Sequence, residues 1–592
     1  MRNEQQPIAQ LLKRLWRHLS PRRRGQFTLL IVLMIIASCA EILSIGAVLP
    51  FLAILTDPVR VFEHPTVQPI IHAMGLEEPN QLLLPLTVTF GVAVLVSGTM
   101  RLLLLWASTR YSHGTGADLS ASIYRRALYQ PYAVHVARNS SEVISGIAGK
   151  SGVAMQVINM TLNLIGSVFT LSAILIALLS VDPVIAIAAF GGFGLIYFLI
   201  MRITRNRLLL NSQIIARESS QVIKSLQEGL GGIRDVLLDG SQATYCQIYR
   251  NADQPARIAQ GNSLFISSSP RFGMEALGML LIAALAYSLA SQADGIAKAI
   301  PVLGALALGA QRLLPVLQQA YSAWSGIQSS HASLQDALEL LDQPLPDYAE
   351  QPLAQLLPFQ HRIKLKQLSF RYSPQTPWVL KNIELTIDKG SQVGFIGLTG
   401  SGKSTLLDII MGLLLPTSGT IEVDGESIAE GTPRAWQAHI AHVPQSIFLA
   451  DSTIEENIAF GVPVGQIDLK RVRDSAQKAQ IADIIETWPK QYKTFVGERG
   501  IRLSGGQRQR IGIARALYKQ ADVIIFDEAT SALDNETERA LMQAIEGLSK
   551  DLTLLIIAHR LTTLKNCNLI LELRDGGINR IGKYEDIVAQ TS

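Results

Sequence analysis

The sequence predicts a multidomain protein in which an all-α domain of six membrane-spanning helices is fused to an α/β P-loop domain. Of the 592 residues, 48% are hydrophobic and only 17% are charged, against about 25% charged in an ordinary soluble protein. Long apolar runs fill the first 330 positions, whereas apolar and charged residues alternate in the remainder, which also carries a glycine-rich phosphate-binding motif. Because one soluble fold could not cover so much apolar surface, we expect a membrane half and a soluble half.

Six apolar stretches in the first part are each near or above the roughly 20 residues that cross a bilayer as a helix. The first follows a basic segment and is too long for the apolar core of a cleaved signal peptide, so we expect it to be retained. An Asp-Pro turn separates the third stretch from the fourth. The predicted spans are residues 27–55, 82–107, 153–180, 183–203, 263–290 and 296–322.

The placement of Lys and Arg sets the expected orientation of these spans. The N-terminal segment 1–26 and the loops 108–150 and 204–262 are rich in Lys and Arg, so we expect them in the cytoplasm. The loop 56–81 carries mainly acidic charges and should lie outside. Six spans then return residues 361–592 to the cytoplasm, where ATP is available. The sequence therefore predicts a multi-pass protein of the lipid bilayer with both termini cytoplasmic.

Composition also predicts the domain boundaries. Helices that continue from the membrane into the cytoplasm, joined by short transverse segments near 127–135 and 238–247, would give a transmembrane domain over 27–341. Residues 342–360 contain four prolines and are expected to form a linker. Short strands alternate with helical segments over 361–592, as in an α/β domain.

Charge and cysteine content exclude several classes of function. The formal net charge of +4 is too small to suggest a nucleic-acid partner. Cys39, Cys246 and Cys567 are far apart and form no CxxC pair, so neither a disulfide framework nor a zinc site is indicated.

The strongest functional signal is Gly397-Leu-Thr-Gly-Ser-Gly402-Lys403-Ser404, which fits GxxxxGK[ST] between an apolar strand and a helix. In this motif backbone N–H groups surround the phosphates, the lysine reaches the β and γ phosphates, and the hydroxyl can bind Mg²⁺. The alternative is a glycine-rich turn that merely opens a buried helix. The predicted nucleotide contacts here are Gly397, Thr399, Gly400, Ser401, Gly402, Lys403, Ser404 and Thr405.

Two acids follow a second apolar strand, Val523–Phe526. Ligands of doubly wound sheets bind at the carboxyl ends of the strands. Asp527 is therefore expected to hold Mg²⁺, and Glu528 to orient or deprotonate the attacking water. Without other motifs, two acids at this position would more often be a solvent-exposed strand end. Together with a phosphate-binding loop, they predict nucleotide hydrolysis.

A Ser-Gly-Gly turn precedes a basic helix near residue 505. The N-terminus of a helix is a ready anion site, although a simple helix cap would explain the turn if it stood alone. The residues of this motif are Ser504, Gly505, Gly506 and Gln507.

Together these motifs resemble the nucleotide-binding domain of ABC transporters over nearly all of 361–592. The resemblance implies ATP and Mg²⁺ as cofactors. It also implies that Tyr372 stacks on adenine, that Gln445 contacts Mg²⁺ and serves catalysis, that Asp534 contacts the dimer partner, and that His559 contacts the γ-phosphate.

In that family the Ser-Gly-Gly signature of one subunit completes the phosphate site of the other, so the resemblance implies a dimer. Because Glu528 and the signature are both intact, a homodimer with two active sites is expected.

The order of membrane half and nucleotide half resembles exporter-type ABC half-transporters. Residues 40–55, 129–147 and 231–240 further resemble the lipid-linked oligosaccharide flippases of bacterial N-glycosylation. That resemblance implies a bacterial inner-membrane protein that flips a polyprenyl-pyrophosphate glycan from the cytoplasmic leaflet by alternating access.

Three arginines are candidate cargo contacts, namely Arg101, Arg271 and Arg312. Charges inside spans are costly and often mark cargo paths, and the guanidinium fork suits phosphate. All three are expected on the cytoplasmic side. In the structural alternative, Arg271 pairs with Glu275, while Arg101 and Arg312 extend to the interface or lie in cytoplasmic extensions.

Other functions remain open at this point. The scaffold could export lipid A, drugs or peptides. An ATP-gated channel or regulator is a second class, against which intact Glu528 and His559 count. A soluble ATPase with a membrane anchor is a third, although six spans exceed what an anchor needs. Glu41 and Lys298, two further charges inside spans, have no assigned role.

Overall fold

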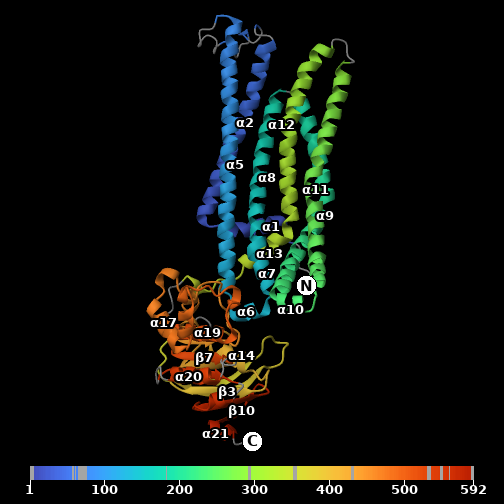
Figure 1. Cartoon of the computed structure of the whole chain (residues 1–592). Helices are drawn as coiled ribbons and strands as arrows, with labels where there is room; N and C mark the ends of the chain where they lie inside the picture. Colours follow the sequence, from blue (N-terminus) through green and yellow to red (C-terminus); the bar gives the residue numbers. More distant parts are fainter. Residues whose placement is uncertain are drawn as a thin grey trace. The chain divides into compact units, whose positions relative to one another are not determined.

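The computed structural model divides into two compact units, which we describe separately (Figure 1). The helical unit comprises Met1–Gln130 and Arg138–Leu345, and the α/β unit comprises Pro131–Ala137 and Pro346–Ser592. The structure describes residues 6–56, 59, 62–63, 68, 77–181, 183–290, 295–350, 357–428, 433–529, 535–546, 551–558 and 561–588.

Each of the six predicted spans lies within a long helix of the helical unit. At 49 residues, α9 is about 74 Å long, more than twice the roughly 30 Å hydrocarbon core of a bilayer. The helices of this unit are α1 (Ile8–Arg17), α2 (Pro21–Thr56), α5 (Leu83–Leu128), α7 (Ser140–Ser145), α8 (Ser151–Val181), α9 (Pro183–Gly231), α10 (Ile233–Leu238), α11 (Gln242–Ala290), α12 (Gly295–Ser329) and α13 (His331–Leu341).

By length and hydropathy, three helices within the described residues could cross a membrane: Pro21–Ser44, Leu83–Leu128 and Ser140–Ile176. The long helices run side by side, with α2 packed on α5, α9 on α11 and α8 on α12 (Figure 1). Two apolar clusters hold them together. One is centred on Ile123 and Leu162, the other on Met274 and Tyr321.

One of the two expected transverse segments lies elsewhere. The short helix α6 (Tyr132–Ala137) overlaps the first predicted segment, and it belongs to the α/β unit. The second short helix, α10, occupies 233–238 rather than 238–247. Adjacent Gly231 and Gly232 end α9 early, because glycine loses the most backbone entropy in a helix. Residues from Gln242 onward already belong to α11.

The α/β unit contains two sheets. The antiparallel sheet has the order β2-β1-β4-β5, from β1 (Arg362–Phe370), β2 (Leu380–Asp388), β4 (Ser418–Val423) and β5 (Glu426–Ser427). The second sheet has the order β10-β9-β3-β8-β7-β6, parallel except at β10, and its core strands are buried on both faces, as parallel strands are. Its strands are β3 (Gln392–Gly397), β6 (Ile440–Val443), β7 (Val523–Asp527), β8 (Thr553–Ile557), β9 (Leu569–Arg574) and β10 (Gly577–Gly582).

Helices pack on these sheets, and two clusters of buried apolar side chains form the core. One cluster includes Phe395 and Trp436, and the other includes Ile511 and Phe526. In the predicted linker, α13 ends at Leu341 and a short turn occupies Asp347–Ala349. The remaining helices are α14 (Lys403–Ile410), α15 (Pro433–Gln437), α16 (Ile454–Ile458), α17 (Leu469–Lys478), α18 (Ala482–Thr487), α19 (Gly505–Lys519), α20 (Asn535–Glu546) and α21 (Tyr584–Val588).

The carboxylate of Asp424 fixes the start of β1. It accepts hydrogen bonds from the backbone N–H groups of Gln360, His361 and Arg362, the last two at 2.9 and 2.7 Å. Burial alone would raise the pKa of Asp424, but these hydrogen bonds lower it below its ordinary value. The ionised carboxylate is therefore the form that stabilises the fold.

We predict that Asp424→Asn destabilises the α/β unit by about 1 kcal/mol at neutral pH, a figure already discounted for solvent screening. Because the folded pKa is lowered, the stabilisation is present above the unfolded pKa of about 4 and is lost as pH falls through the folded value. Thermal unfolding of the full chain in detergent between about pH 3.5 and pH 7 measures this, with exposed Asp575→Asn as control. A deficit that stayed constant with pH would contradict the assignment.

Candidate functional site

The predicted phosphate loop connects β3 to α14, and its glycines adopt conformations that other residues rarely adopt. Gly397 has φ +144° and Gly402 has φ +99°. A Cβ atom at Gly397 would lie 2.3 Å from the carbonyl oxygen of Leu573. The loop can follow this tight path only with glycine at that position.

The inner surface of this loop fits a nucleotide phosphate. The buried Lys403 ammonium donates to the carbonyl oxygens of Gly397 and Leu398, at 2.8 and 3.0 Å. The buried hydroxyl of Ser401 has no hydrogen-bond partner among the residues that the structure describes. A concentrated positive charge beside an unsatisfied hydroxyl is suited to phosphate oxygens.

The two predicted acids lie at the same edge of the sheet, because β3, β8 and β7 are parallel neighbours and their carboxyl ends coincide. The Glu528 N–H donates to the carbonyl of Ile557 at the end of β8, at 3.1 Å. The Gln445 amide donates to the Glu528 carboxylate at 2.7 Å. The structure thus joins two predicted residues that are 83 positions apart.

Electrostatics at this edge suit a divalent cation. Burial raises the pKa of Asp527, and neighbouring Glu528 raises it further, while Lys403 and a hydrogen bond from Ser404 oppose the rise. Burial and then Asp527 raise the pKa of Asp408 on α14 to about 6. Mg²⁺ held by the Asp527 carboxylate and the Ser404 hydroxyl would offset this accumulation of negative charge.

The signature lies at the N-terminus of α19. The hydroxyl of Ser504 accepts from the Gln507 N–H at 3.2 Å, and the Gln507 side chain accepts from the Ser504 N–H at 2.9 Å. This reciprocal cap fixes the turn. Gly505 and Gly506 form the first positions of the helix, where N–H groups have no partner within the helix and can bind an anion.

Tyr372 lies close to the phosphate loop. Its ring is half exposed and packs edge-on against Phe370 with centroids 5.0 Å apart. Its hydroxyl lies 3.2 Å from the Thr405 hydroxyl.

On α6, Tyr132 has a raised pKa, caused first by burial and then by Asp408 and Tyr372. The Tyr132 hydroxyl is therefore near enough to Asp408 and Tyr372 for both to influence its pKa.

Several predicted residues fall outside what the structure describes. Asp534 and His559 lie in segments outside the described residues, as do the side chains of Arg312 and Lys298. The roles of Asp534, His559 and Arg312 remain predictions, and Lys298 has no assigned role. Arg271 donates to Glu275 one turn along α11, at 2.8 Å, as the structural alternative expected.

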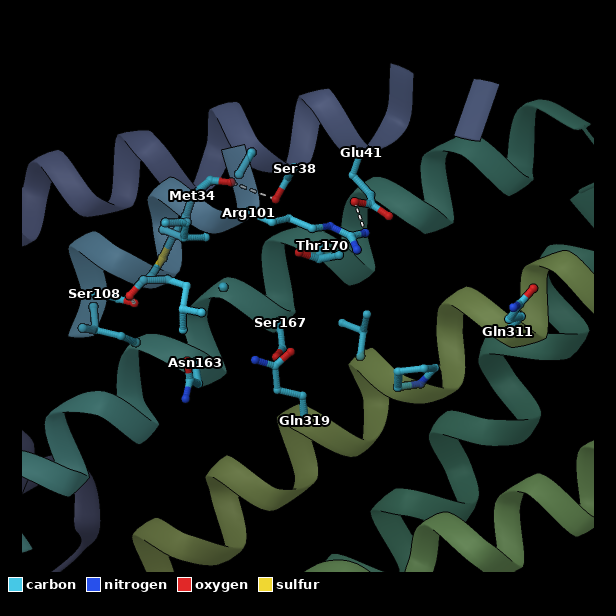
Figure 2. Close-up of a pocket in the computed structure, with 17 residues that line it drawn as sticks. Met34, Ser38, Glu41, Arg101, Ser108, Asn163, Ser167, Thr170, Gln311 and Gln319 are labelled. Atoms are coloured by element: carbon cyan, nitrogen blue, oxygen red, sulfur yellow. Dashed lines mark hydrogen bonds and ion pairs between the residues drawn. The ribbon is translucent and has the colours of Figure 1, made fainter. Parts of the chain in front are cut away.

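The structure gives Arg101 a partner that the sequence did not assign. Its guanidinium forms an ion pair with Glu41 of α2, which is only 3% exposed and also accepts from the Ser97 hydroxyl at 3.3 Å (Figure 2). The sequence alternatives for Arg101 did not include this ion pair, and its role as a cargo contact remains a prediction. A carboxylate inside an apolar span must find a cation. Glu41, a charge within the first predicted span, was the signal in the sequence from which such a pairing could have been inferred.

This ion pair lines a cavity of about 420 Å³ between α2, α5, α8 and α12, which we call the charged cavity (Figure 2). Ser167 on α8 points a buried hydroxyl toward it, with no hydrogen-bond partner in the described part of the chain. Polar lining residues include Ser38, Glu41, Arg101, Ser108, Asn163, Ser167, Thr170, Gln311 and Gln319.

Fold and nucleotide site together are those of an ATP-binding cassette ATPase unit joined in one chain to a helical unit, as in ATP-dependent translocases. Residues 380–531 match the family described as ABC transporter. One helical unit and one α/β unit are the domain composition of an exporter-type half-transporter.

Comparison with known proteins gives two long matches and one shorter one. Over 481 residues, 80% of this chain and 79% of the relative, it is 29% identical to an ATP-dependent lipid A-core flippase of Ralstonia nicotianae. Over 587 residues, 98% and 94% respectively, it is 27% identical to the protein of that name from Cupriavidus metallidurans. A leukotoxin translocation ATP-binding protein of Mannheimia glucosida is 37% identical over 285 residues, 48% of this chain and 40% of that protein.

The fold resembles a solved structure. A bacterial Atm1-family ABC exporter with ATP bound matches 97% of both chains, with a TM-score of 0.78 and 23% identity. This likeness concerns the fold alone, and it extends over both units.

We predict that Glu528→Gln lowers kcat for ATP hydrolysis by about 10²- to 10⁴-fold, because the amide cannot accept a proton from water. ATP binding should persist, so an ATP-bound closed dimer should accumulate. Phosphate release and retention of radiolabelled ATP measure the two effects, with exposed Glu585→Gln on α21 as control. Near-native turnover in Glu528→Gln would exclude Glu528 as the general base.

Proposed function

We propose that this chain works as a homodimer in a bacterial inner membrane and uses ATP hydrolysis to move a phosphate-bearing glycolipid out of the cytoplasmic leaflet by alternating access. The observation that carries the proposal is the charged cavity, where α5 supplies the guanidinium of Arg101, paired with Glu41, near the unsatisfied hydroxyl of Ser167. An anionic polar headgroup is the cargo that such a lining would recognise.

In the proposed nucleotide site, Lys403 and the glycine loop hold the phosphate oxygens. Ser404 and Asp527 would hold Mg²⁺, and bound ATP supplies the phosphoryl bond whose hydrolysis resets the cycle. Glu528 accepts a proton from water, and its hydrogen bond from Gln445 orients the carboxylate. The positions of these groups at one sheet edge support the assignment.

Completion of each site requires the signature of a second copy. The hydrogen bonds between Ser504 and Gln507 remain within the cap, which leaves the helix N-terminus available to a partner's phosphate. Because one chain has one loop and one signature, two copies would form two equivalent sites. Closure would move α6 with its unit, and α6 follows α5 after only three residues.

Two lipid classes are candidates for the cargo. Relatives named lipid A-core flippases, which match up to 98% of this chain, favour a lipid A-type glycolipid. The resemblance of residues 129–147 and 231–240 to oligosaccharide flippases favours a polyprenyl-pyrophosphate glycan. Both lipids carry phosphate and sugar. The first is the better supported, and so the oligosaccharide lipid becomes the alternative.

We predict ATP-dependent flipping of lipid A-core in proteoliposomes, abolished by Glu528→Gln. Labelled polyprenyl-pyrophosphate oligosaccharide is the parallel substrate. Faster movement of the second lipid would reverse the order of the two candidates. If neither lipid moves while ATP is hydrolysed, the glycolipid proposal fails, and drugs and peptides become the cargo to test.

We predict that Arg101→Gln raises the lipid concentration needed for half-maximal ATPase stimulation by about tenfold or more, since a charge-assisted contact is lost. The single variant should also lower thermal stability, because it removes the cation that is paired with buried Glu41. The double variant Glu41→Gln with Arg101→Gln should recover stability without recovering lipid response. Recovery of both would reduce Arg101 to a structural role. Basal ATPase activity is the control.

A further inference from the structure

A second cavity, of about 550 Å³, lies between α8, α9, α11, α12 and the start of α13, and we call it the neutral cavity. None of the described residues that line it is Asp, Glu, Lys, Arg or His. Its lining combines apolar surface with many uncharged polar groups, which are seven serines and the amides of Gln156, Asn163, Gln260 and Gln319. Such a lining can donate and accept hydrogen bonds but provides no countercharge.

The neutral cavity adjoins the charged cavity. Asn163 of α8 and Gln319 of α12 line both, and Figure 2 shows them on the charged side. The neutral cavity lies toward the cytoplasmic ends of the helices in the predicted topology, since Ser263 begins the predicted fifth span and Ser325 follows the sixth. A ligand could therefore occupy both cavities at once.

One hydroxyl in the neutral cavity lacks a partner. Ser325 is 1% exposed, and its hydroxyl makes no hydrogen bond within the described residues. Neighbouring hydroxyls are satisfied, since Ser322 donates to the Ser267 carbonyl at 3.2 Å and Ser263 accepts from Asn211 at 3.2 Å. An unpaired buried hydroxyl lowers stability in the empty protein. A ligand hydroxyl would satisfy it.

The chemistry of the side chains that line the neutral cavity decides which part of a glycolipid can bind there. A phosphate would remain without a countercharge there, and an acyl chain would leave the serine and amide groups unpaired. Sugar hydroxyls both donate and accept, and so match uncharged serines and amides. The volume lies within the roughly 300–1,000 Å³ range of ligand pockets.

We propose that the neutral cavity is a sugar subsite that binds the glycan of the transported lipid while the charged cavity binds its phosphate. This inference rests on the proposed function. The order along the predicted bilayer normal agrees with the chemistry of a glycolipid: acyl or prenyl chain in the membrane, phosphate beside Arg101, and glycan on the cytoplasmic side.

The test uses full-length protein in nanodiscs and two lipid pairs: lipid A with and without core sugars, and polyprenyl pyrophosphate with and without oligosaccharide. The double variant Gln156→Leu with Gln260→Leu keeps side-chain size and changes two exposed residues. We expect half-maximal ATPase stimulation by the sugar-bearing lipid to need about tenfold more lipid, with less than about twofold change for its sugar-free counterpart. Gln247→Leu, exposed on α11 outside the cavity, is the matched control.

A second variant, Ser325→Ala, distinguishes a loss of lipid binding from a loss of stability, because the two properties are expected to change in opposite directions. Removal of an unpaired buried hydroxyl should raise the melting temperature of the empty protein and weaken the response to sugar-bearing lipid. If Ser325→Ala lowers the melting temperature, or if both members of a lipid pair weaken equally or not at all, the sugar subsite is overturned.

Failure of the proposed function would give a different experimental result. If no lipid stimulates the native protein, the glycolipid transport proposal fails, and free core oligosaccharide then tests the cavity directly by ligand-observed NMR at millimolar concentration. Binding to native protein that is lost in the double glutamine variant supports the subsite. Equal signals from both proteins, or none from either, overturn it.

Discussion

Parallel pairing of β3, β8 and β7 is the constraint on which the nucleotide site depends. Their apolar residues are buried on both faces, so the strands keep one register and end at one edge. That edge brings the loop at Gly397 together with the acids at 527–528. A shift in this pairing would separate Lys403 from Asp527, whatever the local motifs contained.

The cost of leaving polar groups unpaired connects the chemistry of the two units. In the α/β unit, Gln445 satisfies the carboxylate of Glu528. In the helical unit, Arg101 compensates a nearly inaccessible Glu41. In each case a polar side chain from a distant part of the chain holds a carboxylate near or inside an apolar region. Sites of binding and catalysis commonly use groups held in this way.

The two adjoining cavities divide the proposed cargo by chemistry. One contains the Arg101 guanidinium paired with Glu41, and the polar groups of the other are all uncharged donors and acceptors. This arrangement would reject purely apolar molecules, because serines and amides would lose their hydrogen bonds to water without replacement. It also gives lipid A-type and polyprenyl-pyrophosphate cargo a common recognition principle, since each presents phosphate next to sugar.

The sequence alone determined the features that depend on neighbours in the chain. Apolar runs of about 20 residues predict spans, and Gly397–Ser404 after an apolar strand predicts a phosphate loop, because the chemistry there is local. Tertiary structure decided what depends on distant pairing: the ion pair of Glu41 with Arg101, the hydrogen bond that Gln445 donates to Glu528, and the neutral cavity formed by several helices. Such contacts depend on helix rotation and strand order, which short-range spacing does not specify.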